Sequence, residues 1–345
     1  LQENLTKQRK RFRIILIHAL QDLNYVLNQT QNAGHKMPIK IPKDLPARQI
    51  LEHEGILVIK DTDAVRQDIR PLRIALLNLM PKKIATETQI ARLLGSSPLQ
   101  IEMTLISPSG YTPKNTPTEH MIDFYHSWEK IRAEKFDGLI TTGAPIERLP
   151  FEEVLYWDEL RNIFDWSKTN VHGTFNLCWG AQAALFHFYK IQKFELPNKI
   201  FGVYLHQKNQ SNLLLVNGLN DEIPIPVSRY TENRREDLLA NKNLEILIDS
   251  NESGVCLVYD KKLKHVHMFN HLEYETDTLH EEYLRDTSKE VKIQKPNNYY
   301  PDDNPIRTPK NTWRSNGYLL FNNWLNLIYQ TTPFDIEDIG KKNNC

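Results

Sequence analysis

Between residues 72 and 188 the chain alternates short apolar segments with segments of helical periodicity. In chain order the predicted strands are 72–79, 99–106, 136–143 and 171–177, and the predicted helices are 84–94, 118–135, 152–167 and 181–188. Strands that alternate with helices pair in parallel, because each helix carries the chain back along one face of the sheet. The pattern therefore predicts an α/β fold, a mostly parallel sheet flanked by helices.

The second half of the chain has shorter strand-like segments separated by turns. They are 199–205, 212–216, 244–249, 255–259 and 264–269. This spacing predicts a mixed or antiparallel extension of the same sheet. Two further helices are expected at 276–286 and 317–329, and the stretch rich in Pro, Asn and Tyr at 296–307 predicts an ordered surface loop.

Cys178 stands between the predicted strand 171–177 and the predicted helix 181–188. A tight turn there lifts the side chain out of the sheet and places it at a helix N-terminus, where the dipole favours a thiolate. Gly180 allows the close backbone approach that such a turn needs. The geometry is that of a nucleophile elbow with cysteine in place of serine. The alternative is a buried structural cysteine, as most free cysteines are.

A thiolate nucleophile needs a base, and His271 is the best placed of the 12 histidines because it also follows a predicted strand. Glu273 lies two residues further on and, in an extended segment, projects to the same side. Together they predict a nucleophile, a base and a group that orients the base. The alternative for His271 is an exposed loop histidine.

Other polar groups carry weaker signals. His265 and His267 fall on one face of a predicted strand, but no carboxylate completes a ligand set in the sequence, so we predict no metal site. Lys82 and Lys83 follow the first core strand, where a lysine can stabilise an oxyanion or a phosphate, or simply be solvated. The loop around Gly143 lacks the lysine pattern of a phosphate-binding loop, which excludes nucleotide hydrolysis.

The composition bears on which partners and which cellular compartment the protein has. The 43 basic and 43 acidic side chains balance, so there is no basic excess to favour a nucleic-acid partner. Three cysteines do not make a disulfide framework and suit a reducing cytoplasm. No run of apolar residues is long enough to predict a membrane span.

Residues 1–36 differ in character from the rest, with a basic run, a short apolar run and a Gln/Asn-rich stretch. A signal peptide is one interpretation; we prefer Met37 as the true start, with 1–36 a dispensable or spurious extension. Residues 37–335 are expected to form a single domain, and residues 336–345 a polar C-terminal tail.

From Met37 to about Pro333 the sequence resembles the homoserine O-acyltransferases of the class I glutamine amidotransferase-like superfamily. The segments that carry the resemblance are MPIKIPKDLPA at 37–47, IRPLRIALLNLMPKKIATETQ at 69–89, NTPTEH at 115–120, FDGLITTGAP at 136–145, CWGAQAALF at 178–186, HLEYE at 271–275 and TWRSNGYLLFNNWLN at 312–326. The resemblance implies a flavodoxin-like fold and acyl transfer from an acyl-coenzyme A to the hydroxyl of L-homoserine, an early step of methionine biosynthesis.

The resemblance also implies residue roles. Cys178 would carry the acyl group, with His271 as the proton acceptor and Glu273 as its partner. Lys83 and the backbone at Trp179 would support the oxyanion. Positions implied to bind homoserine or set its specificity are Lys199, Ser228, Arg229 and Arg285. Asn176 stands where amidotransferases usually have glycine, which weakens a glutaminase interpretation.

Members of the family differ in using acetyl- or succinyl-coenzyme A. In succinyl-preferring members a glycine leaves room for the succinyl carboxylate, and here Glu147 stands at that position. Its volume and charge predict acetyl-coenzyme A as co-substrate. The alternatives are a succinyl donor with an exposed Glu147 that has no role, a glutaminase-like hydrolase of the same fold, or a binding protein without catalysis. We expect no permanently bound cofactor, no nucleic-acid or membrane partner, and a cytoplasmic homodimer.

Overall fold

The structure is a computed structural model that describes residues 39–40, 45–53, 58–59, 70–109, 115–288 and 293–341. Pro38–Cys345 form one compact unit. The predicted extension 1–36 lies outside the described residues. Among the described helices, none has the length and apolar character needed to cross a bilayer.

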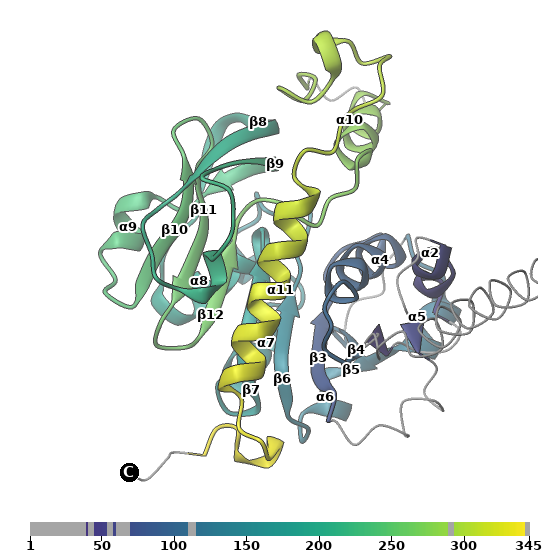
Figure 1. The fold of residues 1–345 in the computed structure, drawn as a ribbon, viewed down its shortest axis with the longest axis vertical. Helices are drawn as coiled ribbons and strands as arrows, with labels where there is room; N and C mark the ends of the chain where they lie inside the picture. Colours follow the sequence, from purple (N-terminus) through teal and green to yellow (C-terminus); the bar gives the residue numbers. More distant parts are fainter. Residues whose placement is uncertain are drawn as a thin grey trace, which may run out of the picture. The chain divides into compact units, whose positions relative to one another are not determined.

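A parallel sheet forms the centre of this unit (Figure 1). Its strand order is β2-β1-β4-β3-β6-β7-β12, and every neighbouring pair along this path is parallel. The strands are β1 (Ile39–Lys40), β2 (Val58–Ile59), β3 (Leu72–Leu77), β4 (Ile101–Ser107), β6 (Phe136–Thr141), β7 (Val171–Leu177) and β12 (His265–Met268). The four segments predicted as core strands are therefore parallel neighbours, as the alternation of strands and helices required.

The sheet continues beyond β12 as an antiparallel extension, in the order β11-β10-β8-β9. These strands are β8 (Phe194–Lys208), β9 (Glu222–Glu232), β10 (Leu244–Ser250) and β11 (Gly254–Asp260). The sequence did not predict β9. The predicted strand 212–216 is wrong, because Leu214–Val216 form a short 3-10 helix whose backbone bonds stay local.

Helices cover both faces of the parallel strands (Figure 1). On one face α11 (Arg314–Thr331) lies against β6, where a side chain at Gly138 would meet Trp324 and Ile328. α2 (Ala47–His53) and α4 (Lys83–Leu94) join the same core. On the other face lie α7 (Trp157–Asn170) and α8 (Trp179–Tyr189), whose aromatic residues make a second core.

The segment 118–135, predicted as one helix, is divided into α5 (Thr118–Phe124), β5 (Tyr125–Ser127) and α6 (Trp128–Ile131). β5 pairs in parallel with β4. The Tyr125 hydroxyl donates to the buried Glu87 at 2.5 Å and accepts from Asn78 at 2.9 Å. These long-range contacts outweigh the local helical preference, because they satisfy buried polar groups.

The remaining elements are short. They are η1 (Phe151–Glu153), α9 (Arg235–Leu239), α10 (Thr278–Ser288), η3 (Pro301–Asp303) and η4 (Ile336–Asp338). Within the predicted tail, Ile339 is buried, and Lys135 donates to the carbonyl of Glu337.

Candidate active site

Cys178 is the N-cap residue of α8 and directly follows β7. Its backbone has φ 49° and ψ −119°, a region that non-glycine residues rarely adopt and that costs about 1–3 kcal/mol. A Cβ at Gly180 would lie 2.6 Å from the carbonyl oxygen of Thr142, so only glycine fits this turn. The sharp turn leaves the Cys178 side chain partly exposed at the carboxyl end of the sheet. The structure thus contains the elbow geometry predicted from the sequence.

His271 lies three residues beyond β12, the parallel neighbour of β7. The N–H of Cys178 donates to the carbonyl of Met268 at 2.6 Å, and the N–H of His271 donates to the carbonyl of Pro226 at 2.9 Å. These two hydrogen bonds hold the backbone of Cys178 against β12 and the backbone of His271 against β9. Pairing of β7 with β12 therefore brings together two residues that are far apart in the sequence.

Glu273 holds the other side of the imidazole, with its Oε1 2.6 Å from Nδ1 of His271. Burial alone lowers the pKa of His271, but the charges of Glu273 and Cys178, and the hydrogen bond to Glu273, raise that pKa well above its usual value. With Nδ1 bound to Glu273, Nε2 has no oxygen or nitrogen partner among the described residues and remains available to the thiol. The arrangement leaves Nε2 as the imidazole nitrogen that can accept a proton from the Cys178 thiol.

Glu147 lies between this pair and β9. Its Oε2 accepts from the N–H of Tyr230 at 2.9 Å. Burial raises the pKa of Glu147, opposed by the Tyr230 N–H and by the positive charges of Lys199, His271 and Arg229. The carboxylate thus binds the backbone of β9 and lies within electrostatic reach of His271.

The predicted homoserine positions gather around α10. The Ser228 hydroxyl donates to Glu282 Oε2 at 2.5 Å, and Lys199 Nζ lies 3.4 Å from the same oxygen and 3.4 Å from Asp286 Oδ2. Arg285 Nε donates to Asp286 Oδ1 at 2.8 Å. The structure therefore brings Lys199, Ser228 and Arg285 into one network with two carboxylates.

Arg229 points away from that network, because its side chain is buried and donates to the carbonyl of Ser253. The indole of Trp179 is fully buried in the core, so only its backbone N–H can face the crevice. That N–H belongs to the first turn of α8 and has no partner within the helix. The side chain of Trp179 therefore packs in the core, and its N–H is the part of the residue that could bind an oxyanion.

Lys83 is fully buried at the start of α4. Its Nζ donates to the carbonyl of Asn78 and lies 5.1 Å above the Tyr125 ring. Burial lowers the pKa of Lys83 to about 8, against the opposing effect of Glu87. Glu87 in turn bonds Tyr125 and His120. Lys83 is therefore one member of a buried polar network at the carboxyl end of β3.

Sequence reasoning missed two residues that complete the site. Tyr274 stacks on His271, and its hydroxyl donates to Glu282 Oε1 at 2.8 Å. Glu282 also accepts from Ser228, so Tyr274 and Glu282 connect His271 to the predicted homoserine positions. Tyr274 belongs to the segment HLEYE that carried the family resemblance, whereas Glu282 is one acidic residue among several on a polar helix and gave no signal.

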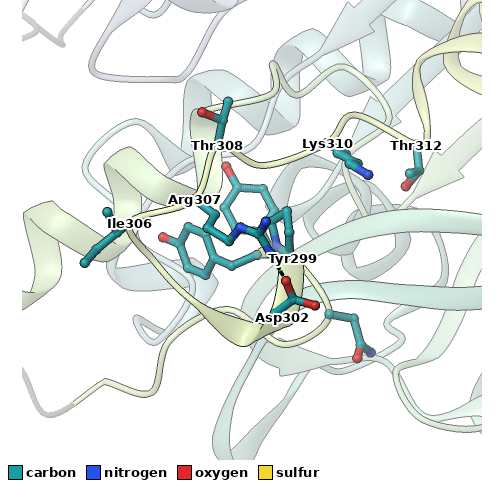
Figure 2. A pocket seen from close by; sticks show the side chains of 10 residues that line it. Tyr299, Asp302, Ile306, Arg307, Thr308, Lys310 and Thr312 are labelled. Atoms are coloured by element: carbon teal, nitrogen blue, oxygen red, sulfur yellow. Dashed lines mark ion pairs between the residues drawn. The ribbon is translucent and has the colours of Figure 1, made fainter.

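A hollow of about 750 Å³ lies elsewhere, between residues 298 and 312 (Figure 2). Arg307 pairs with Asp302 on its wall, and Tyr299, Ile306 and Lys310 also line it. None of the predicted site residues lines this hollow. It is therefore separate from the chemistry around Cys178.

The fold and the elbow together define a class. The chain is similar in fold to a glutamine amidotransferase from Thermotoga maritima, with a TM-score of 0.51 and 11% sequence identity over 76% of this chain and 100% of that chain. The fold is thus that of the class I glutamine amidotransferases, as the sequence predicted.

Sequence comparison then gives the family. The homoserine O-succinyltransferase family matches residues 38–334. The chain is 55% identical over 305 residues to a homoserine O-acetyltransferase of Hyphomonas neptunium, and 52% identical over 305 residues to one of Brucella canis. Each match covers 88% of this chain and 100% of the relative. The chain belongs to the homoserine O-succinyltransferase family, which confirms the predicted resemblance.

Proposed function

We propose that this protein transfers an acetyl group from acetyl-coenzyme A to the hydroxyl of L-homoserine, through an acyl-cysteine at Cys178. The observation that carries the proposal is the Cys178–His271–Glu273 arrangement at the elbow of a chain from this family, with His271 Nδ1 held 2.6 Å from Glu273. The product, O-acetyl-L-homoserine, would serve methionine biosynthesis.

In the first step the Cys178 thiol gives its proton to Nε2 of His271, and the thiolate attacks the thioester carbonyl. The negative oxygen that forms is stabilised by the N–H of Trp179 at the N-terminus of α8. The buried ammonium of Lys83 adds positive charge at the carboxyl end of β3, which is separated from β7 by β6. The bond to coenzyme A breaks, coenzyme A leaves as the thiol with the proton from His271, and the acetyl group stays on sulfur.

In the second step His271 accepts the proton of the homoserine hydroxyl, and the alkoxide attacks the acetyl-cysteine. The thiolate leaves, and the proton returns to it from His271. Lys199, Ser228 and Arg285 would bind the amino-acid part of homoserine, because a guanidinium or an ammonium attracts its carboxylate. Glu282 and Asp286, which these residues contact, would attract its ammonium group. Arg229, buried behind Ser228, would set homoserine specificity by fixing the position of β9.

Glu147 supports acetyl over succinyl as the transferred group. A succinyl chain carries a second carboxylate, and Glu147 would place another negative charge in the space this group needs. A succinyl donor is the second candidate, favoured by the family's description. The ratio of kcat/KM for the two donors separates the candidates, and a higher value for succinyl-coenzyme A would contradict the proposal.

Intact-mass measurement tests the acyl-enzyme. Acetyl-coenzyme A without homoserine should add one acetyl group to the protein, and Cys178→Ala should abolish that adduct. Cys256→Ala is the matched control, since Cys256 is buried and burial raises its pKa to about 12. An adduct that survives Cys178→Ala would disprove the role of Cys178. Release of ammonia from glutamine would instead support a glutaminase.

The proposed reaction uses small-molecule substrates and needs no bound cofactor in its chemical steps. We further propose a homodimer in the cytoplasm, supported by the prevalence of twofold oligomers and by the low number of cysteines. Sedimentation of the full chain at several concentrations would test the dimer, and a single monomeric species would refute it.

A further inference from the structure

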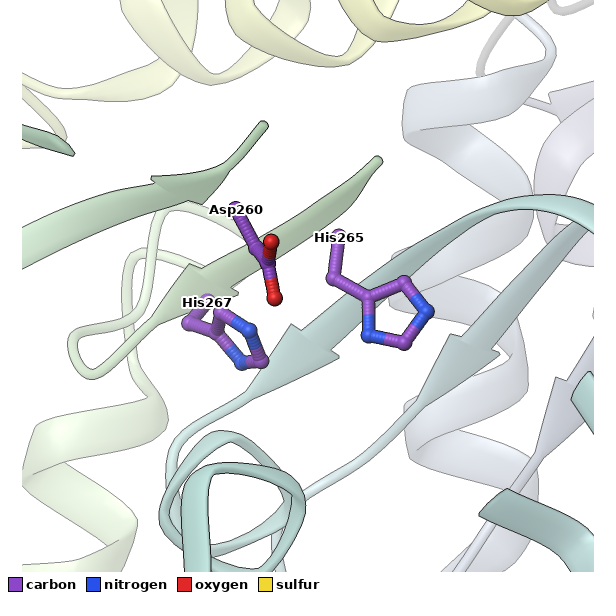
Figure 3. A group of neighbouring side chains, drawn as sticks. All are labelled: Asp260, His265 and His267. Carbon is purple, nitrogen blue, oxygen red and sulfur yellow. The ribbon is translucent and has the colours of Figure 1, made fainter. Parts of the chain in front are cut away.

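Three buried side chains converge where β11 turns into β12: Asp260, His265 and His267 (Figure 3). Each offers one ligand atom, and these atoms all lie within 4.8 Å of one another. Asp260 pairs with His265 across the antiparallel strands, and strand alternation puts His267 on the same face as His265. The sequence offered only the two histidines; the hairpin register supplies the carboxylate.

The two imidazoles have unused polar atoms in a fully buried position. Both ring nitrogens of His267 and Nδ1 of His265 have no hydrogen-bond partner among the described residues. Leaving a buried polar atom without a partner costs about 1–3 kcal/mol. A neutral imidazole has one ring nitrogen with a free lone pair, so each ring can supply one ligand atom. These nitrogens are available as ligands.

The carboxylate is held in place from the opposite side. Asp260 Oδ1 accepts from the N–H groups of Lys262 and Leu263, and Oδ2 accepts from the Tyr189 hydroxyl at the end of α8. Within the described residues no basic side chain forms an ion pair with Asp260. The contacts orient the carboxylate, as outer partners of a metal ligand do, and leave its negative charge without a cation.

We propose that Asp260, His265 and His267 bind one divalent transition-metal ion of the zinc type, with a solvent molecule as a further ligand. Two imidazoles and a carboxylate are a ligand set that Zn²⁺ accepts. Bonds of about 2.0–2.1 Å place tetrahedral ligands about 3.3 Å apart, so the widest ligand pair would close by at most about 1.5 Å on binding. The ion would bind one nitrogen of each imidazole and supply a countercharge for Asp260.

This site would stabilise the fold rather than take part in acyl transfer. It joins β11, β12 and, through Tyr189, the C-terminal end of α8. His267 lies four residues before His271 along the chain, and the three proposed ligands are distinct from Cys178, His271 and Glu273. Removal of the ion should therefore lower the melting temperature and leave kcat/KM of the proposed reaction unchanged.

Metal titration of the full chain tests the proposal. The thiolate of Cys178 next to His271 also attracts such ions, so the titration uses the Cys178→Ala protein after treatment with a chelator. Zn²⁺ should bind at one ion per chain and raise the melting temperature. Co²⁺ should give a visible absorption without a thiolate charge-transfer band, as nitrogen and oxygen ligands predict.

Variants assign the ion to its ligands. His267→Phe should abolish binding and the thermal shift, whereas His187→Gln, a histidine of α8 that contacts Asp165 instead, should preserve both. If His267→Phe does not fold, Asp260→Asn decides, because it keeps the size and the Tyr189 contact. No stabilisation by Zn²⁺, or binding that survives Asp260→Asn at unchanged stoichiometry, overturns the proposal. Acyl transfer is measured separately on protein that retains Cys178, and its outcome does not change the conclusion about metal binding.

Discussion

The phenol ring of Tyr274 stacks on the imidazole of His271, with ring centroids 4.1 Å apart and an interplanar angle of 16°. Its hydroxyl donates to Glu282, whose other oxygen accepts from Ser228. Burial, followed by the charges of Glu282, Glu273 and Cys178, raises the pKa of Tyr274 well above its usual value, so the phenol remains a donor. One side chain thus connects the proposed base with the proposed homoserine positions.

Tyr274→Phe should separate these two contacts. The stack on His271 remains, but Glu282 loses a donor. A hydrogen bond to a charged group contributes about 1.5 kcal/mol or more, so KM for homoserine should rise about tenfold with little change in kcat. Steady-state kinetics check this, with Tyr283→Phe on α10 as the control. A fall in kcat at constant KM would mean that the hydroxyl acts on His271 instead.

Glu273→Gln should lower kcat by about 10²–10⁴-fold, the usual contribution of a positioned general base, because the amide no longer stabilises the charged imidazole. The same change should shift the acidic limb of the pH profile of kcat/KM to lower pH, since Glu273 raises the pKa of His271. Steady-state rates measured at several pH values, with acetyl-coenzyme A as the varied substrate, give both kcat and the pH profile of kcat/KM. An unaltered profile would remove Glu273 from the proposed mechanism.

Gly143→Ala should impair acyl transfer without unfolding the protein. A Cβ at Gly143 would lie 3.1 Å from Cβ and 3.6 Å from Sγ of Cys178, and 3.7 Å from the N–H nitrogen of Trp179. The added methyl group would therefore occupy the space of the thioester. Gly173→Ala on β7 is the matched control, with its nearest contact at 3.4 Å. Equal activity in both variants would place the donor on another side of Cys178.

Glu147→Gly should raise kcat/KM for succinyl-coenzyme A relative to acetyl-coenzyme A, by tenfold or more if one repulsive contact of about 1.4 kcal/mol disappears. Glu147→Gln separates charge from volume, because it keeps the bulk and removes the repulsion. Competition between the two donors in one reaction mixture measures the ratio directly. An unchanged ratio in both variants would leave Glu147 without a part in donor selection.

Acid sensitivity should trace in part to His206. Nδ1 of His206 faces the carbonyl of Tyr204, and Nε2 accepts from Asn270, the residue before His271. Burial lowers the pKa of His206 to about 4, so between about pH 6.5 and 4 the unfolded state binds the extra proton and the folded state does not. Stability from this group is complete above pH 6.5 and falls by up to about 1.4 kcal/mol per pH unit below it.

Urea unfolding at pH 7.5, 6.0 and 5.0 measures that dependence. His206→Gln should flatten the slope and lower stability at pH 7.5, whereas exposed His126→Gln should leave the slope as it is. An unchanged slope in His206→Gln would assign the acid sensitivity to other groups.

Local sequence patterns predicted the parallel part of the fold because its strands are continuous apolar runs that can be recognised one at a time. The apolar runs at β3, β4, β6 and β7 and the glycine at 180 need no knowledge of partners. The antiparallel extension was predicted only in outline, since β9 contains two prolines and alternates less clearly. The helix predicted over 118–135 is wrong although its local pattern is helical. The hydroxyl of Tyr125 binds Glu87, which is distant in the sequence, and this contact accompanies a break in the helix.

Site residues divide in the same way. Cys178, His271 and Glu273 stand out because each occupies a distinctive place in the chain, at a strand end or two residues from a partner. The association of Lys199 and Ser228 with Glu282 depends on how α10 packs beside β8 and β9, and no local sequence pattern predicts that packing. Asp260 was missed beside His265 and His267 because only the register of the hairpin brings it to them.

The pairing of β7 with β12 has a kinetic consequence. The hydrogen bonds within α8 join residues that are close in the chain, whereas His271 is brought beside Cys178 by the pairing of β12 with β7, two strands that lie far apart in the sequence. Contacts of long sequence separation form slowly. During refolding, helical signal should therefore return before the ability to form an acyl-enzyme, and catalytic activity reports the closure of the sheet.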